Sequence, residues 1–138
     1  MKPSVFYKIA AILLVLFAAG HTSGFRKLDP AWKVDDVVRS MQVVHFVAQG
    51  FDRTYYEFYV GFGLFVSVFL LFSAVIAWQL GAVRAETLSR LPGLKWGLVV
   101  CFALVTFLSW KYFFVAPVVF SALITLCLGL GACLPARQ

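Results

Sequence analysis

Four long apolar runs dominate the pattern of hydrophobic and polar positions along the chain. They cover residues 4–20, 55–80, 94–110 and 116–134. A run of about 17–25 apolar residues is long enough for a helix that crosses the hydrocarbon core of a bilayer. Only a short connection separates the last two runs, and short connections join antiparallel neighbours. The pattern therefore predicts an all-α fold, in which residues 1–138 form a single membrane-embedded, up-down four-helix bundle.

The first run is the least regular, because Lys8 interrupts it near its start. Basic residues before an apolar core, followed by the small residues Ala18 and Gly20, are also typical of a signal peptide that is cleaved before His21. We expect the segment to stay in the chain as the first membrane helix.

The start of the second run carries a capping-box pattern, because Thr54 and Glu57 have the S/T-x-x-E spacing. In this motif the hydroxyl accepts a hydrogen bond from a backbone N–H of the first helical turn. The carboxylate in turn accepts one from the backbone N–H of the cap residue. Pro117 marks the start of the fourth run, since proline is well tolerated in the first turn of a helix.

The segment of residues 21–53 contains too many polar side chains to cross a membrane. From Val34 to Gln49, however, apolar positions recur at helical spacing, with polar positions opposite them. Gly50 follows, and glycine commonly ends a helix. We predict a non-spanning amphipathic helix over about residues 34–49, which lies at the membrane interface or folds back over the helix ends.

The composition agrees with a membrane protein and excludes several other classes. Hydrophobic residues make up 62% of the chain and charged residues 13%, against about 45–50% and about 25% in soluble domains. Soluble, disordered, collagen-like and coiled-coil proteins are therefore excluded. The net charge of +6 comes from basic residues that mostly flank apolar runs, so it indicates membrane topology and no nucleic-acid partner. The cysteines show no C-x-x-C spacing, so neither a disulfide framework nor a zinc site is predicted.

The basic residues also bear on the orientation in the membrane. Four crossings divide them evenly, six on each side. Because Arg84, Arg90 and Lys95 lie close to helix ends in a short loop, we expect that loop and both termini on the cytoplasmic side.

Two of the predicted helices carry stripes of small residues, where helices can pack closely in lipid. The stripes consist of Gly63, Ser67, Ala74 and Gly81 on the second run, and of Ser121, Thr125, Gly129 and Cys133 on the fourth. We interpret both as helix contacts within one chain, and an oligomer interface is the alternative. A leucine at position 129 is expected to force the fourth helix away from its neighbour.

Titratable and tyrosine side chains gather near the helix ends on one side of the predicted bundle. Ionisable groups near a membrane are costly, so this gathering is a candidate functional site. Five of its members are predicted to line one ligand-binding cavity under the amphipathic helix: His21, His45, Tyr56, Glu57 and Tyr59. Capping is an alternative role for Glu57. If His45 points into bulk water, a role as a subunit replaces the cavity hypothesis.

Other members of this group have simpler interpretations. Asp52 and Arg53 are expected to form a solvated pair, and Lys111 to extend from a hairpin tip towards water. The imidazoles of His21 and His45 could together bind haem or a metal, and one neutral histidine could transfer protons, but both residues also fit a structural role. The sequence contains no known catalytic motif, so no catalytic residue or metal ligand is predicted and the cofactor is unknown.

Three stretches of the chain carry a resemblance to a known family. They are AAGHTSGF (residues 18–25), HFVAQGFDRTYYEFYVGFGLFVSVFLLFSAVIAWQL (45–80) and SWKYFFVAPVVFSALITLCL (109–128). These stretches look like an uncharacterised family of small bacterial four-helix membrane proteins, itself similar in layout to DoxX-like proteins. The resemblance covers nearly the whole chain and implies a four-helix bundle in a bacterial inner membrane. It implies no particular reaction.

Three functions fit these features, and we rank them in this order. The first is binding of a lipidic molecule, such as a quinone, an isoprenoid or a lipid, in a polar-rimmed bundle cavity. The second is an accessory or assembly subunit that contacts other membrane proteins or a second copy of itself. The third is an intramembrane isomerase or cyclase in which His45 or Glu57 acts as acid or base.

Overall fold

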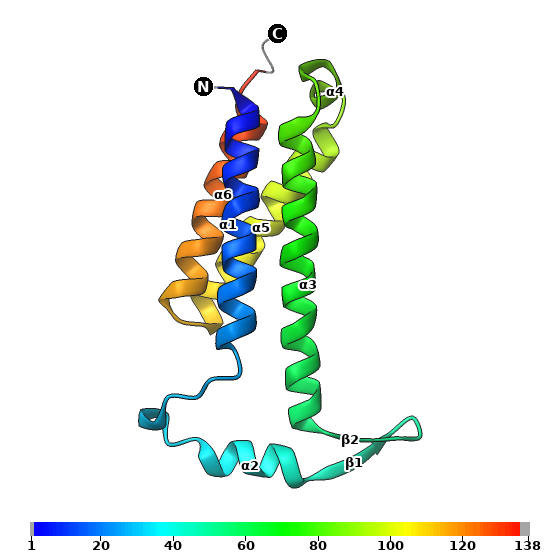
Figure 1. Ribbon diagram of the computed structural model, residues 1–138, viewed down its shortest axis with the longest axis vertical. Helices are drawn as coiled ribbons and strands as arrows, with labels where there is room; N and C mark the ends of the chain where they lie inside the picture. The colour runs from blue at the N-terminus through cyan, green and yellow to red at the C-terminus, as the bar shows by residue number, and fades with distance from the viewer. Residues whose placement is uncertain (1, 136–138) are drawn as a thin grey trace. The chain divides into compact units, whose positions relative to one another are not determined.

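The computed structural model describes residues 2–135 (Figure 1). In chain order these residues form α1 (Pro3–Gly24), the 3₁₀ helix η1 (Pro30–Trp32), α2 (Asp35–Val43), β1 (His45–Ala48), β2 (Phe51–Thr54), α3 (Tyr55–Ala82), α4 (Ala85–Ser89), α5 (Pro92–Tyr112) and α6 (Val115–Cys133). The fold is mostly helical, with 80% of the described residues in helices. This confirms the predicted all-α class, apart from the short hairpin of β1 and β2.

Among residues 2–135, four helices are long and apolar enough to cross a membrane: α1, α3, α5 and α6. They coincide with the four predicted runs. The largest difference is at the end of α1, which continues to Gly24, so His21 lies inside the last helical turn. The short helix α4 is not predicted by the pattern, and an ion pair of 2.7 Å between Glu86 and Arg90, one turn apart, supports it.

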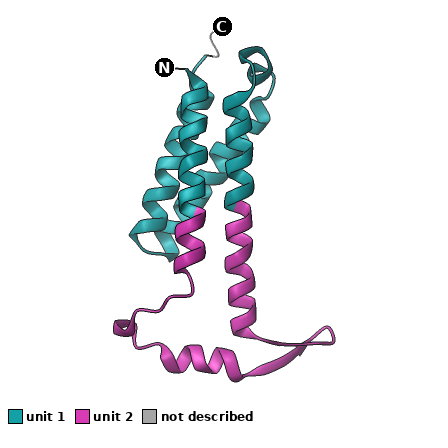
Figure 2. Cartoon of the chain, in the orientation of Figure 1, with its two compact units in different colours: residues 1–17, 70–138 teal, residues 18–69 magenta. Residues whose placement is uncertain are grey.

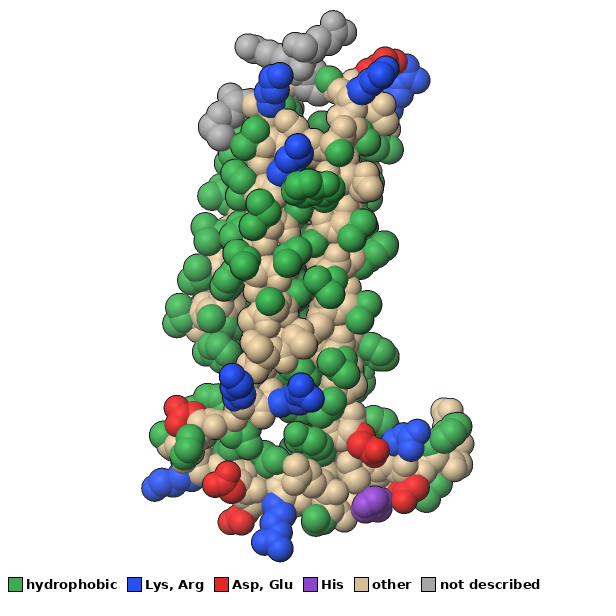
Figure 3. Space-filling view, in the orientation of Figure 1, with side chains coloured by type: hydrophobic (Ala, Val, Ile, Leu, Met, Phe, Trp, Pro, Cys, Tyr) green, Lys and Arg blue, Asp and Glu red, His purple; other side chains and the backbone are tan. Residues whose placement is uncertain are grey.

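Hydrophobic side chains cover the outside of the long helices in the view of Figure 3, whereas charged side chains lie near the helix ends and over α2 and the hairpin. Many large apolar residues are exposed, including Phe62, Phe65 and Val115. In water such surfaces would favour association, and in a bilayer they are the normal outer face of a bundle.

The chain divides into two compact units (Figure 2). Unit 1 consists of residues 1–17 and 70–138, and unit 2 consists of residues 18–69. The core side chains of unit 1 with almost no exposure include Tyr7, Leu14, Leu70, Leu80, Phe102, Ile124 and Leu128. Unit 2 contains the end of α1, the connecting segment with α2 and the hairpin, and the first half of α3.

Two glycines let Tyr7 pack closely inside unit 1. A Cβ built on Gly131 of α6 would lie 3.0 Å from the Tyr7 ring, and one built on Gly81 of α3 would lie 3.0 Å from the backbone oxygen of Ser4. Gly81 thus belongs to a close helix contact, in line with its predicted place in a small-residue stripe. The helices α5 and α6 are neighbours joined by a two-residue connection. The hydroxyl oxygen of Thr106 on α5 lies 3.2 Å from the hydroxyl oxygen of Thr125 on α6.

The close contact predicted at Gly129 is absent among residues 2–135. A Cβ built on Gly129 would meet no atom within 4 Å, whereas Gly131, outside the predicted stripe, touches Tyr7. Positions 129 and 131 point about 200° apart around a helix, so a shift of two residues reverses the face. A leucine at position 129 is therefore not expected to displace α6 from a neighbouring helix of the same chain.

The predicted amphipathic helix over residues 34–49 is shorter in the structure, because α2 ends at Val43 and β1 follows. In the hairpin, His45 pairs with Thr54, Phe46 with Arg53, Val47 with Asp52 and Ala48 with Phe51. The turn residues Gln49 and Gly50 both have positive φ, 53° and 87°. Positive φ at both central residues is typical of a two-residue hairpin turn. Gly50 therefore belongs to the turn between β1 and β2 and does not end a helix.

Candidate functional site

A group of aromatic and polar side chains joins the end of α1 to the first half of α3 within unit 2. The Nε2 atom of His21 lies 2.9 Å from the backbone oxygen of Gly63. The His21 ring stacks on the ring of Phe25, with centroids 5.1 Å apart. The hydroxyl of Tyr59 donates to the backbone oxygen of Phe25. We call this group, with Thr22 and Ser67, the α1–α3 cluster.

Hydroxyl groups continue the α1–α3 cluster along the helix pair. The Oγ1 atom of Thr22 lies 2.7 Å from the Oγ atom of Ser67 and 2.7 Å from the backbone oxygen of Ala18. Ser67 in turn can donate to the backbone oxygen of Gly63 at 3.3 Å. These hydroxyls and the imidazole of His21 therefore bond to groups of the chain itself, which favours a structural role in holding α1 to α3.

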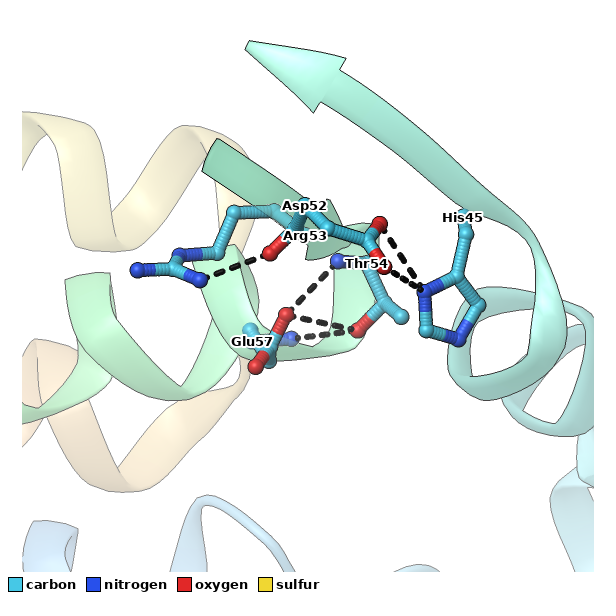
Figure 4. Close-up of polar contacts among 5 residues, drawn as sticks. All are labelled: His45, Asp52, Arg53, Thr54 and Glu57. Carbon is cyan, nitrogen blue, oxygen red and sulfur yellow. Dashed lines mark hydrogen bonds and ion pairs between the residues drawn. The ribbon is translucent and has the colours of Figure 1, made fainter. Parts of the chain in front are cut away.

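His45 lies on the hairpin and not on a helix. Its Nδ1 atom is 3.0 Å and 3.1 Å from the two carboxylate oxygens of Asp52 on the facing strand (Figure 4). The two side chains are 60% and 65% exposed. Within residues 2–135, no hydrogen bond, ion pair or ring contact links His45 to the α1–α3 cluster, so the structure does not bring the two histidines together in one site.

Glu57 acts as the predicted cap of α3. Its Oε2 atom accepts a hydrogen bond of 2.7 Å from the backbone N–H of Thr54, and its own N–H donates to the Thr54 hydroxyl at 3.2 Å (Figure 4). Both bonds of the capping box are present, so that prediction is confirmed. The remaining member, Tyr56, lies half-buried beside Tyr59, with ring centroids 6.2 Å apart.

The predicted site residues therefore belong to three arrangements, of which the last two adjoin, because His45 is the strand partner of Thr54. His21, Tyr56 and Tyr59 lie in or beside the α1–α3 cluster, His45 pairs with Asp52, and Glu57 caps α3. Whether any of them binds a ligand stays a prediction.

A shallow, open depression that the sequence did not predict lies where the hairpin meets the start of α3. Its volume is about 350 Å³, and it is lined by Ala48, Gln49, Phe51, Arg53 and Phe58. The register puts Phe46, Ala48, Phe51 and Arg53 on one face of the hairpin and His45 and Asp52 on the other. Phe46 connects that first face to α3, since its ring lies 5.4 Å from the ring of Phe58. We call this space the hairpin cavity.

The guanidinium of Arg53 is the charged group of the hairpin cavity. Its Nη1 atom donates to the backbone oxygen of Asp52 at 2.6 Å, and its central carbon lies 5.4 Å from the centroid of the Phe51 ring. Within residues 2–135, Arg53 has no ion pair with a carboxylate. The predicted solvated pair of Asp52 and Arg53 is thus replaced by a pair of Asp52 with His45.

Among residues 2–135, no three or more His, Cys, Asp or Glu side chains gather closely enough to hold a metal ion. The three cysteines are unpaired. Lys111 lies over the ring of Tyr112, 5.0 Å from its centroid, in unit 1.

No protein-family model, curated protein or solved structure matches this chain. A functional proposal therefore depends on the geometry of the chain itself. The α1–α3 cluster and the hairpin cavity differ in whether their polar groups already have partners within the chain. The hydrogen-bonding groups of His21, Thr22 and Tyr59 are used within the α1–α3 cluster, whereas the charge of Arg53 in the hairpin cavity has no acidic partner within residues 2–135.

Proposed function

We propose that this chain is a multi-pass membrane protein whose four apolar helices form an up-down bundle in a bacterial inner membrane. The length and hydropathy of α1, α3, α5 and α6 support this proposal. An even number of crossings puts both termini on one side, which we propose to be the cytoplasmic side. The bacterial origin rests on the resemblance in the three sequence stretches described above.

We further propose that the protein binds a lipidic molecule, such as a lipid, a quinone or an isoprenoid, in the hairpin cavity. One observation carries this proposal: the cavity combines apolar walls from Phe51 and Phe58 with the guanidinium of Arg53, on the strand that leads directly into α3. An amphiphile at a bilayer surface likewise has a polar head next to an apolar chain. A concave apolar site with a few polar groups is the usual form of a small-molecule site.

The bundle cavity that the sequence suggested is not the proposed site, because the His45 side chain is 60% exposed and pairs with Asp52. Ligand binding still ranks before the subunit role because of the hairpin cavity, which the sequence did not predict. In the α1–α3 cluster, His21 and Tyr59 bond to backbone oxygens of the chain, so those groups are not free for a ligand unless the bonds break. We therefore propose that this cluster supports the site by fixing the start of α3, and that the ligand lies in the hairpin cavity.

Native mass spectrometry of the full chain, extracted in a mild detergent, tests this proposal. We expect a retained amphiphile in the wild type and its loss in Phe51→Ser. Phe113→Ser is the matched control, because Phe51 and Phe113 are 63% and 65% exposed and both lie outside the long helices. A wild-type chain without any retained amphiphile, or equal loss in both variants, contradicts the proposal.

A second candidate function, an accessory subunit of a membrane complex, is favoured by α2. This helix has no buried residue, although Val38 and Met41 form an apolar face, so α2 is not fully covered by its own chain. A partner protein or the membrane interface could cover it. Partner chains in a fixed ratio in the same mass spectra would favour this function.

The third candidate function, an intramembrane isomerase or cyclase, has no supporting observation comparable to the hairpin cavity or the exposed helix α2. Its proposed acid or base groups are His45, which bonds to Asp52, and Glu57, which caps α3. Both groups have local partners on the surface of unit 2. We therefore rank this function last.

A further inference from the structure

We infer that the ligand of the hairpin cavity is an anionic amphiphile, with its acidic head group on Arg53 and its hydrocarbon chain along a row of phenylalanines on α3. This inference depends on the proposed function and adds the charge of the ligand and the path of its chain. It follows from the surroundings of Arg53 and from the rings that continue the cavity wall.

Arg53 is oriented for an external anion. In Figure 4 its guanidinium points away from the imidazole of His45, and the carboxylate of Asp52 is turned towards that imidazole. One N–H of Arg53 is used by a backbone oxygen. A guanidinium has five N–H donors, so donors remain for a phosphate or carboxylate, and such charge-assisted bonds are the stronger kind.

The nearest acidic groups are engaged elsewhere. Asp52 accepts from His45 on the other face of the hairpin. Glu57 accepts from the backbone N–H of Thr54 at the start of α3, where the positive end of the helix dipole favours a carboxylate. Neither forms an ion pair with Arg53.

General attraction to an anionic membrane surface is weak for this part of the chain. Unit 2 contains five basic and five acidic residues: Arg26, Lys27, Lys33, Arg39 and Arg53 against Asp29, Asp35, Asp36, Asp52 and Glu57. Because these charges balance, the net charge of +6 comes from unit 1, and a preference of unit 2 for an anionic ligand has to come from the local position of a single cation. This makes the contribution of Arg53 separable by experiment.

A row of phenylalanines leads away from the cavity along α3. Phe58 lines the cavity, its ring centroid is 6.5 Å from that of Phe62, and Phe62 is 6.3 Å from Phe65. These three side chains are 41%, 67% and 71% exposed. The row covers about 10 Å of helix at about 1.5 Å per residue. Spacings of four and three residues keep the rings on one face, so they offer a continuous apolar path for a chain.

The test compares three probes on the purified full-length protein by native mass spectrometry. They are dioleoyl-phosphatidylglycerol, dioleoyl-phosphatidylcholine with the same chains but no net charge, and glycerol 3-phosphate with no chains. We expect the anionic lipid to bind roughly tenfold more tightly than the neutral lipid, because the choline cation of the neutral lipid offsets the attraction between its phosphate and Arg53. We expect no detectable binding of glycerol 3-phosphate, because it lacks the apolar part.

Variants of two arginines identify the residue responsible. Arg53→Gln is expected to remove the preference for the anionic lipid, and Arg53→Lys to keep most of it. Arg26→Gln is the matched control, since Arg26 also lies over a phenylalanine ring, at 5.5 Å from Phe25, but does not line the cavity. Far-UV circular dichroism of each variant checks that the helices are intact.

The outcomes separate this inference from the function on which it depends. Equal binding of both lipids, or an unchanged preference in Arg53→Gln, overturns the inference and leaves lipid binding in place. Binding of glycerol 3-phosphate as tight as that of the anionic lipid overturns the chain path and identifies a phosphate site. Binding of none of the probes, together with no amphiphile retained by the wild-type chain, overturns the proposed function itself.

Discussion

The ring of Phe25 occupies the space in which residue 63 would carry a side chain. A Cβ built on Gly63 would overlap three atoms of that ring. The ring cannot move away freely, because it stacks on His21 and its centroid lies 5.8 Å from that of Tyr59. The absence of a side chain at Gly63 therefore permits the close approach that holds the end of α1 against α3.

Gly63→Ala is accordingly expected to lower the free energy of unfolding by about 1–3 kcal/mol, as overpacking does. Gly61→Ala is the control on the same helix, where an added Cβ meets no atom within 4 Å. That change is expected to be neutral or to stabilise by about 0.5–1 kcal/mol. Denaturant titration in detergent micelles measures both. Equal effects of the two substitutions would contradict the Phe25 contact.

Two glycines of α6 provide a second matched pair. Gly131→Ala puts a Cβ at 3.0 Å from the ring of Tyr7, which is fully buried, and we expect a loss of about 1–3 kcal/mol in stability. Gly129→Ala faces open space and is expected to be tolerated, as is Gly129→Leu. Thermal unfolding followed by circular dichroism compares them. Severe loss of folded protein in Gly129→Leu would point instead to an interface at that position, for example between two copies of the chain.

The hydroxyl of Tyr7 gives a third prediction. It is buried and has no hydrogen-bond partner within residues 2–135. Leaving a buried hydroxyl unpaired costs about 1–3 kcal/mol, so Tyr7→Phe is expected to stabilise the protein by up to that amount. Tyr59→Phe is the contrast, because it removes a donor to the Phe25 backbone and should destabilise by about 0.5–1.5 kcal/mol. If Tyr7→Phe destabilises as much as Tyr59→Phe, the Tyr7 hydroxyl has a partner in solution.

The long helices could be predicted from the sequence because their signals are local. A continuous apolar run of this length has few alternatives to a helix, and the spacing of Thr54 and Glu57 is sufficient to position the start of α3. The short connection between α5 and α6 could be predicted for the same reason, because the two apolar runs are almost adjacent in the sequence. These features depend on neighbours in the sequence and on helix geometry alone.

The sequence of the hairpin predicts the end of a helix because its pattern fits both structures. His45–Ala48 alternates between more and less exposed positions, but four residues are too few to separate a period of two from one of 3.6. Gln49–Gly50 is a weaker turn signal than Asn–Gly, since glutamine rarely adopts positive φ. A glycine after an amphipathic stretch was therefore interpreted as a helix end, although here it completes a strand turn.

The candidate site could be predicted only in part, because its contacts depend on tertiary structure. The partner of His21 is a backbone oxygen 42 residues away, and no pattern of residue types reveals a backbone acceptor. From the sequence, Asp52 and Arg53 are predicted to form a solvated pair. Adjacent residues of a strand point to opposite faces, which is why Asp52 pairs across the hairpin with His45 and leaves Arg53 at the cavity.

The two polar pairs of the hairpin region are expected to differ in their effect on stability. Thr54→Ala removes the cap of α3 and should cost about 1 kcal/mol. Asp52→Asn weakens an ion pair whose members are mostly exposed, and it should cost about 0.5 kcal/mol or less. Denaturant titration at neutral pH compares them. A larger loss for Asp52→Asn than for Thr54→Ala would indicate that the pair with His45 is covered by a ligand or a partner.

The proposed topology gives the last prediction, which concerns the side of the membrane on which each connection lies. Replacing Cys101, Cys127 and Cys133 by alanine allows single cysteines to be introduced elsewhere. Four crossings return the chain to its starting side, so cysteines at position 2 and at position 138, which lies outside residues 2–135, should react with a membrane-impermeant maleimide from the same side. A cysteine at position 47, on the exposed strand β1, should react from the opposite side. Labelling of positions 2 and 138 from opposite sides requires an odd number of crossings, and labelling of all three from one side requires that α1 does not cross.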